Sequence, residues 1–221
     1  MAVSECDVLF AVGTRFNDRI TGSTDSFADK AVLIHADIEP DVISRNVPAD
    51  ISVASDAGKL IRILLKRAKP SGAGEWVSRL SLWKQRHPVT VKKSTSEEIS
   101  ARDVTEQIND LFDSAVITTD VGQNQMWASQ FLQLSEKKKM LTSGGMGTMG
   151  YGFPAAIGAK LGDPRKDVIA ICGDGGFQMN IQELATAVLY ELPIIICILN
   201  NGYLGNVRQW QEMFYDRRYS A

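Results

Sequence analysis

Gly173-Asp174-Gly175-Gly176-Phe177-Gln178-Met179-Asn180 is a polar, glycine-rich stretch that directly follows the apolar residues 168–172. That apolar run is rich in β-branched side chains, which is typical of a strand buried on both faces. Residues 180–190 carry apolar side chains at helical spacing, and residues 194–199 form a second apolar run that ends at Asn200-Asn201-Gly202-Tyr203. The sequence therefore predicts a βαβ unit whose two polar clusters lie at the carboxyl ends of parallel strands, where α/β sheets bind ligands.

The two polar clusters have the chemistry of a metal–diphosphate site. The carboxylate of Asp174, the amide oxygen of Asn201 and a nearby backbone carbonyl are hard oxygen ligands, which Mg²⁺ accepts while it also holds phosphate. The glycines beside Asp174 allow unusual backbone angles and the close approach of a ligand. A P-loop nucleotide hydrolase is disfavoured, because no Gly-x-x-x-x-Gly-Lys-Ser/Thr loop is present. A plain βαβ crossover with turn-forming Asp and Asn is the alternative, and the spacing of the second cluster counts against it.

The bulk composition restricts the class of protein. Hydrophobic residues make up 44% of the chain and charged residues 23%, and the net charge of -2 gives no electrostatic reason to expect a nucleic acid or a membrane as partner. Cys6, Cys172 and Cys197 predict free thiols in a reducing compartment rather than a disulfide framework. No apolar run approaches the roughly 20 residues of a membrane span, and no signal peptide is visible. These features predict a cytoplasmic protein.

Strands and helices alternate in the first part of the chain, which favours a parallel sheet. Arg15 and Arg19 follow the first strand and have the chemistry to hold a pyrophosphate, while Asp37 ends the second strand and could accept a hydrogen bond from a ribose hydroxyl. Exposed loop charges are the alternative for the two arginines. A nicotinamide-binding Rossmann site is least favoured, because Gly-x-Gly-x-x-Gly is absent. Strands are expected at residues 7–12, 31–36 and 51–54, and helices at residues 40–47 and 58–69.

A loop-forming Pro70-Ser71-Gly72-Ala73-Gly74 cluster and a helix at residues 75–86 separate this part from the rest. We place the domain boundary near residue 95. The prediction is a first domain over residues 1–70, a linker with a short helix over 71–95, and a second domain over 96–221. In the second domain a strand is expected at residues 115–119, and helices at residues 100–112, 123–134, 154–160 and 203–214.

The predicted helix at residues 123–134 starts immediately after a strand and a Gly122 turn. The first turn of a helix offers free N–H groups and the positive end of the helix dipole, so it is a ready anion site. Gln123 and Asn124 lie at that end and are candidates for hydrogen bonds to a diphosphate. Both are also ordinary residues at a helix start, and the residues alone leave the two interpretations open.

These motifs together resemble the thiamine-diphosphate (ThDP) enzymes. Gly173-Asp174-Gly175, the 24 residues from 176 to 199 and then Asn200-Asn201 are similar to the signature of that family. Three flanking stretches are similar to the large catalytic subunit of acetolactate synthase. This resemblance extends over nearly the whole chain, but the chain corresponds to only part of that subunit. The stretches are Gly122-Gln123-Asn124-Gln125-Met126-Trp127, Ser143-Gly144-Gly145-Met146-Gly147-Thr148-Met149-Gly150-Tyr151-Gly152 and Val207-Arg208-Gln209-Trp210-Gln211-Glu212-Met213-Phe214-Tyr215.

The resemblance implies three cofactors, ThDP, Mg²⁺ and a structural FAD. The metal would be held by Asp174, Asn201 and the carbonyl of Tyr203. ThDP would contact Gln123, Asn124, Gly147, Met149, Gly173, Asp174, Gly175, Gly176, Asn201 and Tyr203. FAD would contact Gly13, Arg15, Asn17, Arg19, Asp37, Asp56 and Ala57, and Val207 and Trp210 would line the substrate channel. The chain departs from the family at three positions: it has Asn124 where His is usual, Asn17 where Asp is usual and Asn206 where Met is usual.

The resemblance also implies an α/β fold with parallel sheets flanked by helices. The first domain would be the second half of an FAD-binding middle domain, and the second a ThDP diphosphate-binding domain truncated at its C-terminus. The implied partners are pyruvate and 2-oxobutyrate, identical subunits in a dimer or tetramer, and a small regulatory subunit.

The reaction implied by the resemblance is the decarboxylative condensation of pyruvate with a second pyruvate or with 2-oxobutyrate, in branched-chain amino-acid biosynthesis. No catalytic residue is expected in this chain, because the family activates ThDP with a Glu from a separate N-terminal domain. We therefore expect the isolated chain to bind ThDP weakly and to be inactive as a synthase. The alternatives are another ThDP enzyme, of the pyruvate oxidase or glyoxylate carboligase type, and a non-catalytic cofactor-binding remnant.

Overall fold

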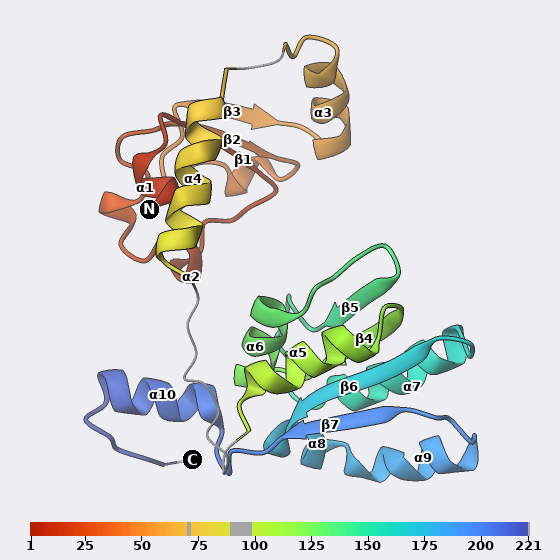
Figure 1. The fold of residues 1–221 in the computed structure, drawn as a ribbon. Helices are drawn as coiled ribbons and strands as arrows, with labels where there is room; N and C mark the ends of the chain where they lie inside the picture. The colour runs from red at the N-terminus through yellow and green to blue at the C-terminus, as the bar shows by residue number, and fades with distance from the viewer. Residues whose placement is uncertain (70–71, 89–98, 221) are drawn as a thin grey trace. The chain divides into compact units, whose positions relative to one another are not determined.

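The computed structural model describes residues 1–69, 72–88 and 99–220, which form two compact units (Figure 1). The first unit takes in the described residues up to 88, and the second those from 99 onward. The boundary expected near residue 95 lies outside the described residues. Each unit contains one parallel sheet with helices beside it, which confirms the predicted α/β class.

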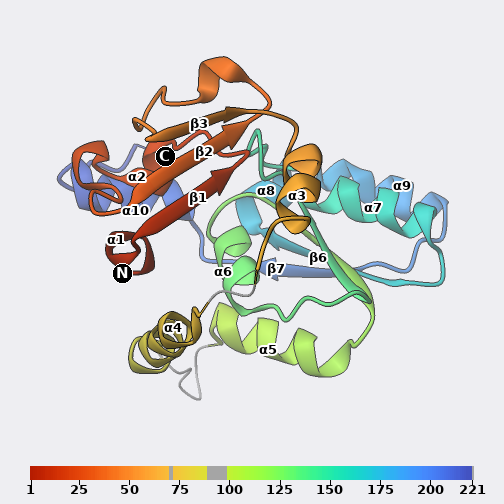
Figure 2. The same ribbon diagram turned by 90° about the horizontal axis from the view of Figure 1, so that it is seen from above.

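The first unit is built on a three-stranded parallel sheet in the order β1-β2-β3 (Figure 2). Each strand lies within one residue of its predicted position, because short β-branched runs end at polar residues. The strands are β1 (Val8–Val12), β2 (Val32–Asp37) and β3 (Ile51–Ala54). The helices are α1 (Ala2–Glu5), α2 (Asp18–Thr21), α3 (Ala57–Leu65) and α4 (Gly74–Arg86), with 3-10 turns η1 (Thr24–Ser26) and η2 (Pro40–Val42).

The helix expected at residues 40–47 is wrong after its first turn. Only η2 forms, because the backbone becomes extended at Ile43 (φ −66°, ψ 128°), and Ser44 after it adopts a left-handed φ of 62°. The hydroxyl of Ser44 then accepts a hydrogen bond from the N–H of Ala49 at 3.1 Å, which fixes the following loop. The predicted helix at residues 58–69 exists as α3, although it ends at Leu65.

The described residues of the first unit cover one face of its sheet and leave the other open. Leu33 and Ala11 pack with Phe16 and Val47 on the covered face. On the other face Val8, Phe10, Val32 and Ile51 are each between 43% and 48% exposed, and the register pairs Val8 with Val32. This face is an apolar surface on which large side chains meet water.

The second unit has a four-stranded parallel sheet in the order β5-β4-β6-β7. Strands β6 and β7 are parallel neighbours, as the predicted βαβ unit requires. Strand β5 was not predicted, because Lys138-Lys139-Met140-Leu141-Thr142 is too polar to be recognised and lies at the edge of the sheet. The strands are β4 (Ala115–Thr119), β5 (Lys138–Thr142), β6 (Asp167–Gly173) and β7 (Ile195–Leu199).

Helices cover both faces of this sheet and bury two apolar clusters. One cluster joins Ile108 of α5 and Ala128 of α6 to the sheet, and the other joins Phe153 of α7 and Phe177 of α8 to the opposite face. Figure 2 shows α5 on one side of β6 and β7, and α7 and α9 on the other. The helices are α5 (Ala101–Leu111), α6 (Gln123–Phe131), α7 (Gly152–Gly162), α8 (Asp174–Met179), α9 (Leu184–Leu189) and α10 (Gly205–Phe214), with the 3-10 turn η3 (Ile181–Glu183).

The helix expected at residues 180–190 is present as η3 followed directly by α9, so its first turn is 3-10, while the short helix α8 before it was not predicted. The backbone of Asn180 has φ −131°, outside the helical range, and η3 and α9 follow it. Its side-chain amide donates instead to the carbonyl of Gly150 at 2.7 Å. Asn180 therefore ends α8 and holds a glycine-rich loop that leads into α7.

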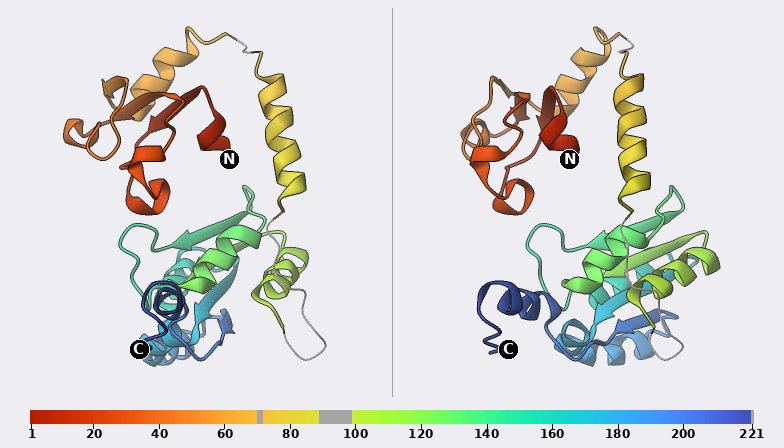
Figure 3. Two further views of the ribbon diagram at one scale, coloured as in Figure 1. Left: turned by 90° about the vertical axis from the view of Figure 1, so that its left-hand side faces the viewer. Right: turned by 60° about the vertical axis from the view of Figure 1, so that its left-hand side comes forward.

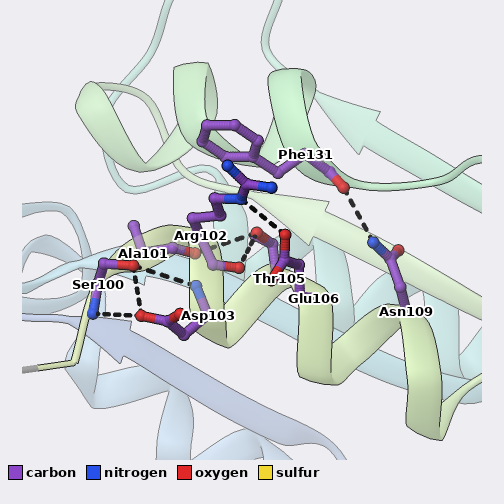
Figure 4. A network of polar contacts seen from close by, with 8 residues as sticks. All are labelled: Ser100, Ala101, Arg102, Asp103, Thr105, Glu106, Asn109 and Phe131. Carbon is purple, nitrogen blue, oxygen red and sulfur yellow. Dashed lines mark hydrogen bonds and ion pairs between the residues drawn. The ribbon is translucent and has the colours of Figure 1, made fainter. Parts of the chain in front are cut away.

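Polar contacts fix α5 against the C-terminal end of α6 (Figure 4). Ser100 caps the N-terminus of α5 together with Asp103. At the other end, the amide of Asn109 donates to the carbonyl of Phe131 at 2.9 Å and accepts from the N–H of Gln133 at 2.9 Å. The guanidinium of Arg102 lies 5.6 Å from the centre of the Phe131 ring. These contacts set the direction of α6, and therefore the place of its N-terminus.

Candidate functional site

A pocket of about 190 Å³ lies in the second unit, beyond the carboxyl ends of β4, β6 and β7. All of the residues predicted to contact ThDP line this one pocket, although they come from four separate parts of the sequence. They are Gln123, Asn124, Gly147, Met149, Gly173, Asp174, Gly175, Gly176, Asn201 and Tyr203. Seven further residues of the lining were not among the predicted contacts of ThDP or the substrate: Val121, Gly122, Trp127, Leu199, Leu204, Gly205 and Asn206.

Asp174 is the first residue of α8 and supplies the only charged side chain in the pocket lining that the structure describes. Its carboxylate is half-buried and makes no hydrogen bond or ion pair to the described residues. The described residues hold no group of three or more His, Cys, Asp or Glu side chains that could bind a metal alone. A metal here would therefore need amide, carbonyl and phosphate oxygens to complete its coordination.

The turn after β7 is fixed by two asparagine side chains. Asn200 accepts a hydrogen bond from the N–H of Gly202 at 3.0 Å, and Asn201 accepts one from the N–H of Tyr203 at 3.1 Å. Gly202 has φ 70°, a left-handed conformation that favours glycine. The amide nitrogen of Asn201 donates to the side-chain oxygen of Gln123 at 3.2 Å. The turn thus presents a defined set of oxygen atoms at the pocket.

Asn124 contributes a buried acceptor that has no partner. Its side chain is 5% exposed, and its nitrogen donates to the carbonyl of Val121 over 3.4 Å. Its oxygen is fully buried and accepts no hydrogen bond from the described residues. An unsatisfied buried carbonyl costs on the order of 1–3 kcal/mol, so a donor that entered the pocket and reached it would recover free energy.

The glycines of the Gly-Asp-Gly motif serve close packing rather than unusual backbone angles. None of Gly173, Gly175 and Gly176 has a positive φ, so that part of the expectation is wrong. A Cβ on Gly176 would overlap the Asp120 carboxylate, and one on Gly175 would lie 2.9 Å from a methyl carbon of Leu204. The groups that lie close to these two glycines are therefore side chains of the protein, Asp120 and Leu204.

Asp120 organises the floor of the site and was not among the predicted site residues. It is fully buried, and its carboxylate accepts hydrogen bonds from the N–H groups of Val121 at 2.8 Å, Gly150 at 3.0 Å and Gly152 at 2.9 Å. One side chain therefore joins the end of β4 to the loop that contains Met149. The available signal was an acidic residue directly after a buried strand and before Gly122.

The two predicted channel residues are placed differently. Val207 lines the pocket, whereas Trp210 lies outside the lining on α10, with 50% of its side chain exposed. After α10 the chain folds back beside the helix (Figure 3), and the N–H of Arg217 donates to the carbonyl of Gln211. The guanidinium of Arg208 lies between two aromatic rings, 3.9 Å from the centre of Tyr203 and 4.4 Å from that of Tyr219.

The residues predicted to contact FAD lie at the carboxyl edge of the first unit's sheet. Gly13 follows β1 with φ 67°, Asp37 ends β2, and Asp56 with Ala57 follows β3. Three of the side chains already have structural partners. Asn17 caps α2, Asp56 caps α3, and Asp37 accepts a hydrogen bond from the N–H of Glu39 at 2.9 Å. Arg15 is exposed, and Arg19 lies in α2.

His35 is a residue of this edge that sequence reasoning missed. It is 1% exposed on β2, and its Nε2 donates to the carbonyl of Thr14 at 2.9 Å. Its other ring nitrogen, Nδ1, accepts from the N–H of Ser44 at 3.4 Å. His35 thereby ties the loop after β1 to the loop after η2.

Comparison with known families decides the identity of both units. The C-terminal TPP binding domain of thiamine pyrophosphate enzymes matches residues 120–221, and the central domain of the same enzymes matches residues 1–64. The chain belongs to the thiamine pyrophosphate enzyme family. The C-terminal match takes in every residue of the pocket lining, and the central-domain match takes in every residue predicted to contact FAD.

Three relatives of this thiamine pyrophosphate enzyme chain are named acetolactate synthase large subunits, one of them as probable. The chain is 45% identical to an acetolactate synthase large subunit from Parasynechococcus marenigrum, over 100% of this chain and 36% of that protein. It is 46% identical to the acetolactate synthase large subunit from Porphyra purpurea, over 99% of this chain and 38% of that protein. A probable acetolactate synthase large subunit from Methanocaldococcus jannaschii is 45% identical over 99% and 39%. The chain thus spans under two fifths of the length of these relatives, and the predicted resemblance is confirmed.

The three thiols of this thiamine pyrophosphate enzyme chain are free and differ in burial. Burial raises the pKa of Cys172 to about 12, with smaller contributions from the nearby Asp120 and Cys197, and burial also raises the pKa of Cys197. We expect iodoacetamide at about pH 8 to label Cys6 first, Cys197 more slowly and Cys172 not at all in the folded chain, because the thiolate is the reactive form. Peptide mass spectrometry measures this order. Equal labelling of all three in urea is the control, and rapid labelling of Cys172 in the folded chain would contradict the prediction.

No helix within residues 1–69, 72–88 and 99–220 of this thiamine pyrophosphate enzyme chain combines the length and hydrophobicity needed to span a bilayer.

Proposed function

We propose that this chain carries the ThDP- and Mg²⁺-binding part of an acetolactate synthase. The whole enzyme would condense pyruvate with a second pyruvate or with 2-oxobutyrate and release CO₂, in the synthesis of branched-chain amino acids. The observation that carries the proposal is the single pocket into which every predicted ThDP contact converges. The names and similarity of the relatives support it as well.

The charges of the pocket support a metal together with a diphosphate. The described lining holds one carboxylate, Asp174, and no Lys or Arg. A diphosphate alone would meet only a like charge there, whereas Mg²⁺ between the two anions would be attracted to both. Asp174, the side-chain oxygen of Asn201 and the carbonyl of Tyr203 would hold the metal. Mg²⁺ is octahedral, so three protein ligands leave room for phosphate oxygens and water.

The remaining residues of the pocket would bind and orient. Asn124 would donate a hydrogen bond from its amide nitrogen to the diphosphate, and Met149 would contact the rings through its thioether. Leu204 and Val207 are apolar and would exclude water from the side where the 2-oxo acid enters. ThDP, when bound, supplies an electron sink for the carbanion of decarboxylation. No Glu is among the described lining residues, so the proton transfer that the resemblance assigns to a Glu is not assigned to this pocket.

For the first unit we propose FAD as ligand. The support is the convergence of Gly13, Asp37 and Asp56 at the carboxyl edge of β1, β2 and β3, where parallel sheets bind ligands. Arg15 is exposed and available for a pyrophosphate. We further propose a small regulatory subunit as a partner of the whole enzyme, because the relatives are named large subunits. From the family resemblance we also propose that the whole enzyme is a homo-oligomer in the cytoplasm.

Two measurements test the function. Titration of the purified chain with ThDP should quench its Trp fluorescence in the presence of Mg²⁺ and not after chelation by EDTA, since Trp127 lines the pocket. A chimera in which this chain replaces the matching segment of the Parasynechococcus marenigrum relative should form acetolactate from pyruvate. A soluble chimera that binds ThDP but forms acetaldehyde, acetate or no product would contradict the synthase assignment.

Asn124 gives a prediction on pH. We expect Asn124→His to bind ThDP more tightly, relative to the natural chain, as the pH falls from about 8 to about 6, because an imidazole with pKa near 6.5 gains a positive charge beside the diphosphate. At each pH the dissociation constant of the variant is divided by that of the natural chain, so that the effect of the titration of ThDP itself cancels. Asn124→Gln is the neutral control. A ratio that is constant with pH would contradict the placement of Asn124 beside the diphosphate.

A further inference from the structure

Gln123 is held by protein partners at both ends of its side-chain amide. Its oxygen accepts a hydrogen bond from the amide nitrogen of Asn201 at 3.2 Å, and its nitrogen donates to the side-chain oxygen of Gln209 on α10 at 3.4 Å. Space for this amide exists because α10 begins at Gly205, where a Cβ would overlap the Gln123 oxygen. The start of α6, the turn after β7 and the start of α10 therefore meet at one side chain.

These contacts fix the orientation of the Asn201 amide. The backbone N–H of Tyr203 can only donate, so the Asn201 atom that it meets at 3.1 Å is the oxygen. The nitrogen then faces the oxygen of Gln123. If the Asn201 amide rotated by half a turn, an N–H group would face the N–H of Tyr203 and an oxygen would face the oxygen of Gln123. Both contacts would become repulsive.

We propose that Gln123 is a positioning residue for the metal: it holds the nitrogen of Asn201 so that the oxygen is the atom presented to Mg²⁺. The proposal rests on the proposed function, in which Asn201 is a ligand. It also differs from the role that the sequence suggested for Gln123, a direct hydrogen bond to the diphosphate. In the structure both ends of that amide have protein partners.

The test is the Mg²⁺ concentration at which ThDP quenching is half-maximal, in the whole chain. Gln123→Met keeps the length of the side chain and removes its acceptor. We expect this variant to need about 10-fold more Mg²⁺, as when a partner of a metal ligand is lost, and to reach nearly the natural ThDP affinity at saturating Mg²⁺. Gln123→Glu keeps an acceptor for Asn201 and should need no more Mg²⁺ than the natural chain. Gln125→Met is the matched control, because Gln125 is on the same helix, bonds to Thr142 and does not line the pocket.

A second background makes the test independent of general damage at Gln123. In Asn201→Asp both terminal atoms of the side chain are oxygens, so its orientation no longer decides whether an oxygen faces the metal. We expect Gln123→Met to shift the half-maximal Mg²⁺ concentration in the natural background and not in the Asn201→Asp background. A shift of equal size in both backgrounds would overturn the proposal.

The remaining outcomes separate this proposal from the proposed function. If Gln123→Met weakened ThDP binding equally at every Mg²⁺ concentration, Gln123 would contact the diphosphate directly, and the positioning role would be overturned. If the natural chain bound ThDP with Mg²⁺ and the variant were unshifted, the positioning role alone would be overturned. If the natural chain showed no Mg²⁺-dependent binding, both would be overturned.

Discussion

Asp174→Asn is expected to weaken ThDP binding in the presence of Mg²⁺ by about 100-fold or more, the largest effect on binding that any single pocket residue should give. Asp174 carries the only charge in the described lining, and the amide that replaces it cannot balance a divalent cation. Folding should change little, because the carboxylate has no hydrogen bond or ion pair to the described residues. The charge of Asp174 at the N-terminus of α8 stabilises the fold by about 1 kcal/mol at most, through its interaction with the helix dipole.

Fluorescence titration with ThDP, with and without Mg²⁺, measures this effect, and thermal unfolding checks the fold. The matched control is Asp167→Asn, because Asp167 is exposed at the opposite end of the same strand, β6. The control should bind ThDP as the natural chain does. If Asp174→Asn also kept its affinity, the metal would not be held at this end of β6.

Asp120→Asn is expected to act on stability instead, and to lower the free energy of unfolding by about 3 kcal/mol. The buried carboxylate accepts hydrogen bonds from three backbone N–H groups, of Val121, Gly150 and Gly152. The NH₂ group of an Asn would have to face at least one of these donors. Loss of the buried charge offsets part of the cost, but the N–H groups already compensate that charge in the natural chain.

Urea unfolding, followed by circular dichroism, measures the change. Asp110→Asn is the control, because Asp110 is exposed on α5 and its substitution should alter the free energy of unfolding by less than about 0.5 kcal/mol. An Asp120→Asn chain as stable as the control would show that the three N–H groups find other partners.

How far the sequence predicts this fold depends on how each residue is used. Six of the seven described strands are largely apolar runs, and they were placed within about one residue. The exception, β5, starts with two lysines and lies at a sheet edge. The end of the helical path at Ile43 and the short helix α8, which stops before Asn180, were missed, because Ser44 and Asn180 make hydrogen bonds to residues of other segments. Periodicity along the chain contains no information about such partners.

The candidate site shows the same division. The residues expected around ThDP follow from motifs, and they converge in one pocket. Asp120 and the Asn201 contact of Gln123 were not foreseen, because they are interactions within the protein rather than with a ligand. Trp210 carries a motif position but lies outside the lining. A sequence motif thus indicates which residues gather, and the structure is needed to distinguish those that face the ligand from those that support them.

The packing of glycines against Asp120 and Gln123 has a consequence for the interpretation of mutational tolerance. Substitution at Gly152 or Gly176 would be rejected in a selection for soluble expression without any cofactor, because a Cβ would meet the backbone or the buried, hydrogen-bonded carboxylate of Asp120, whereas at Gly205 it would meet the flexible end of the Gln123 side chain. Substitutions at Asp174 would be tolerated in that selection, but they would be rejected in a selection for growth that depends on the enzyme. Comparison of the two selections, position by position, would separate residues retained for the architecture of the site from those retained for its ligand.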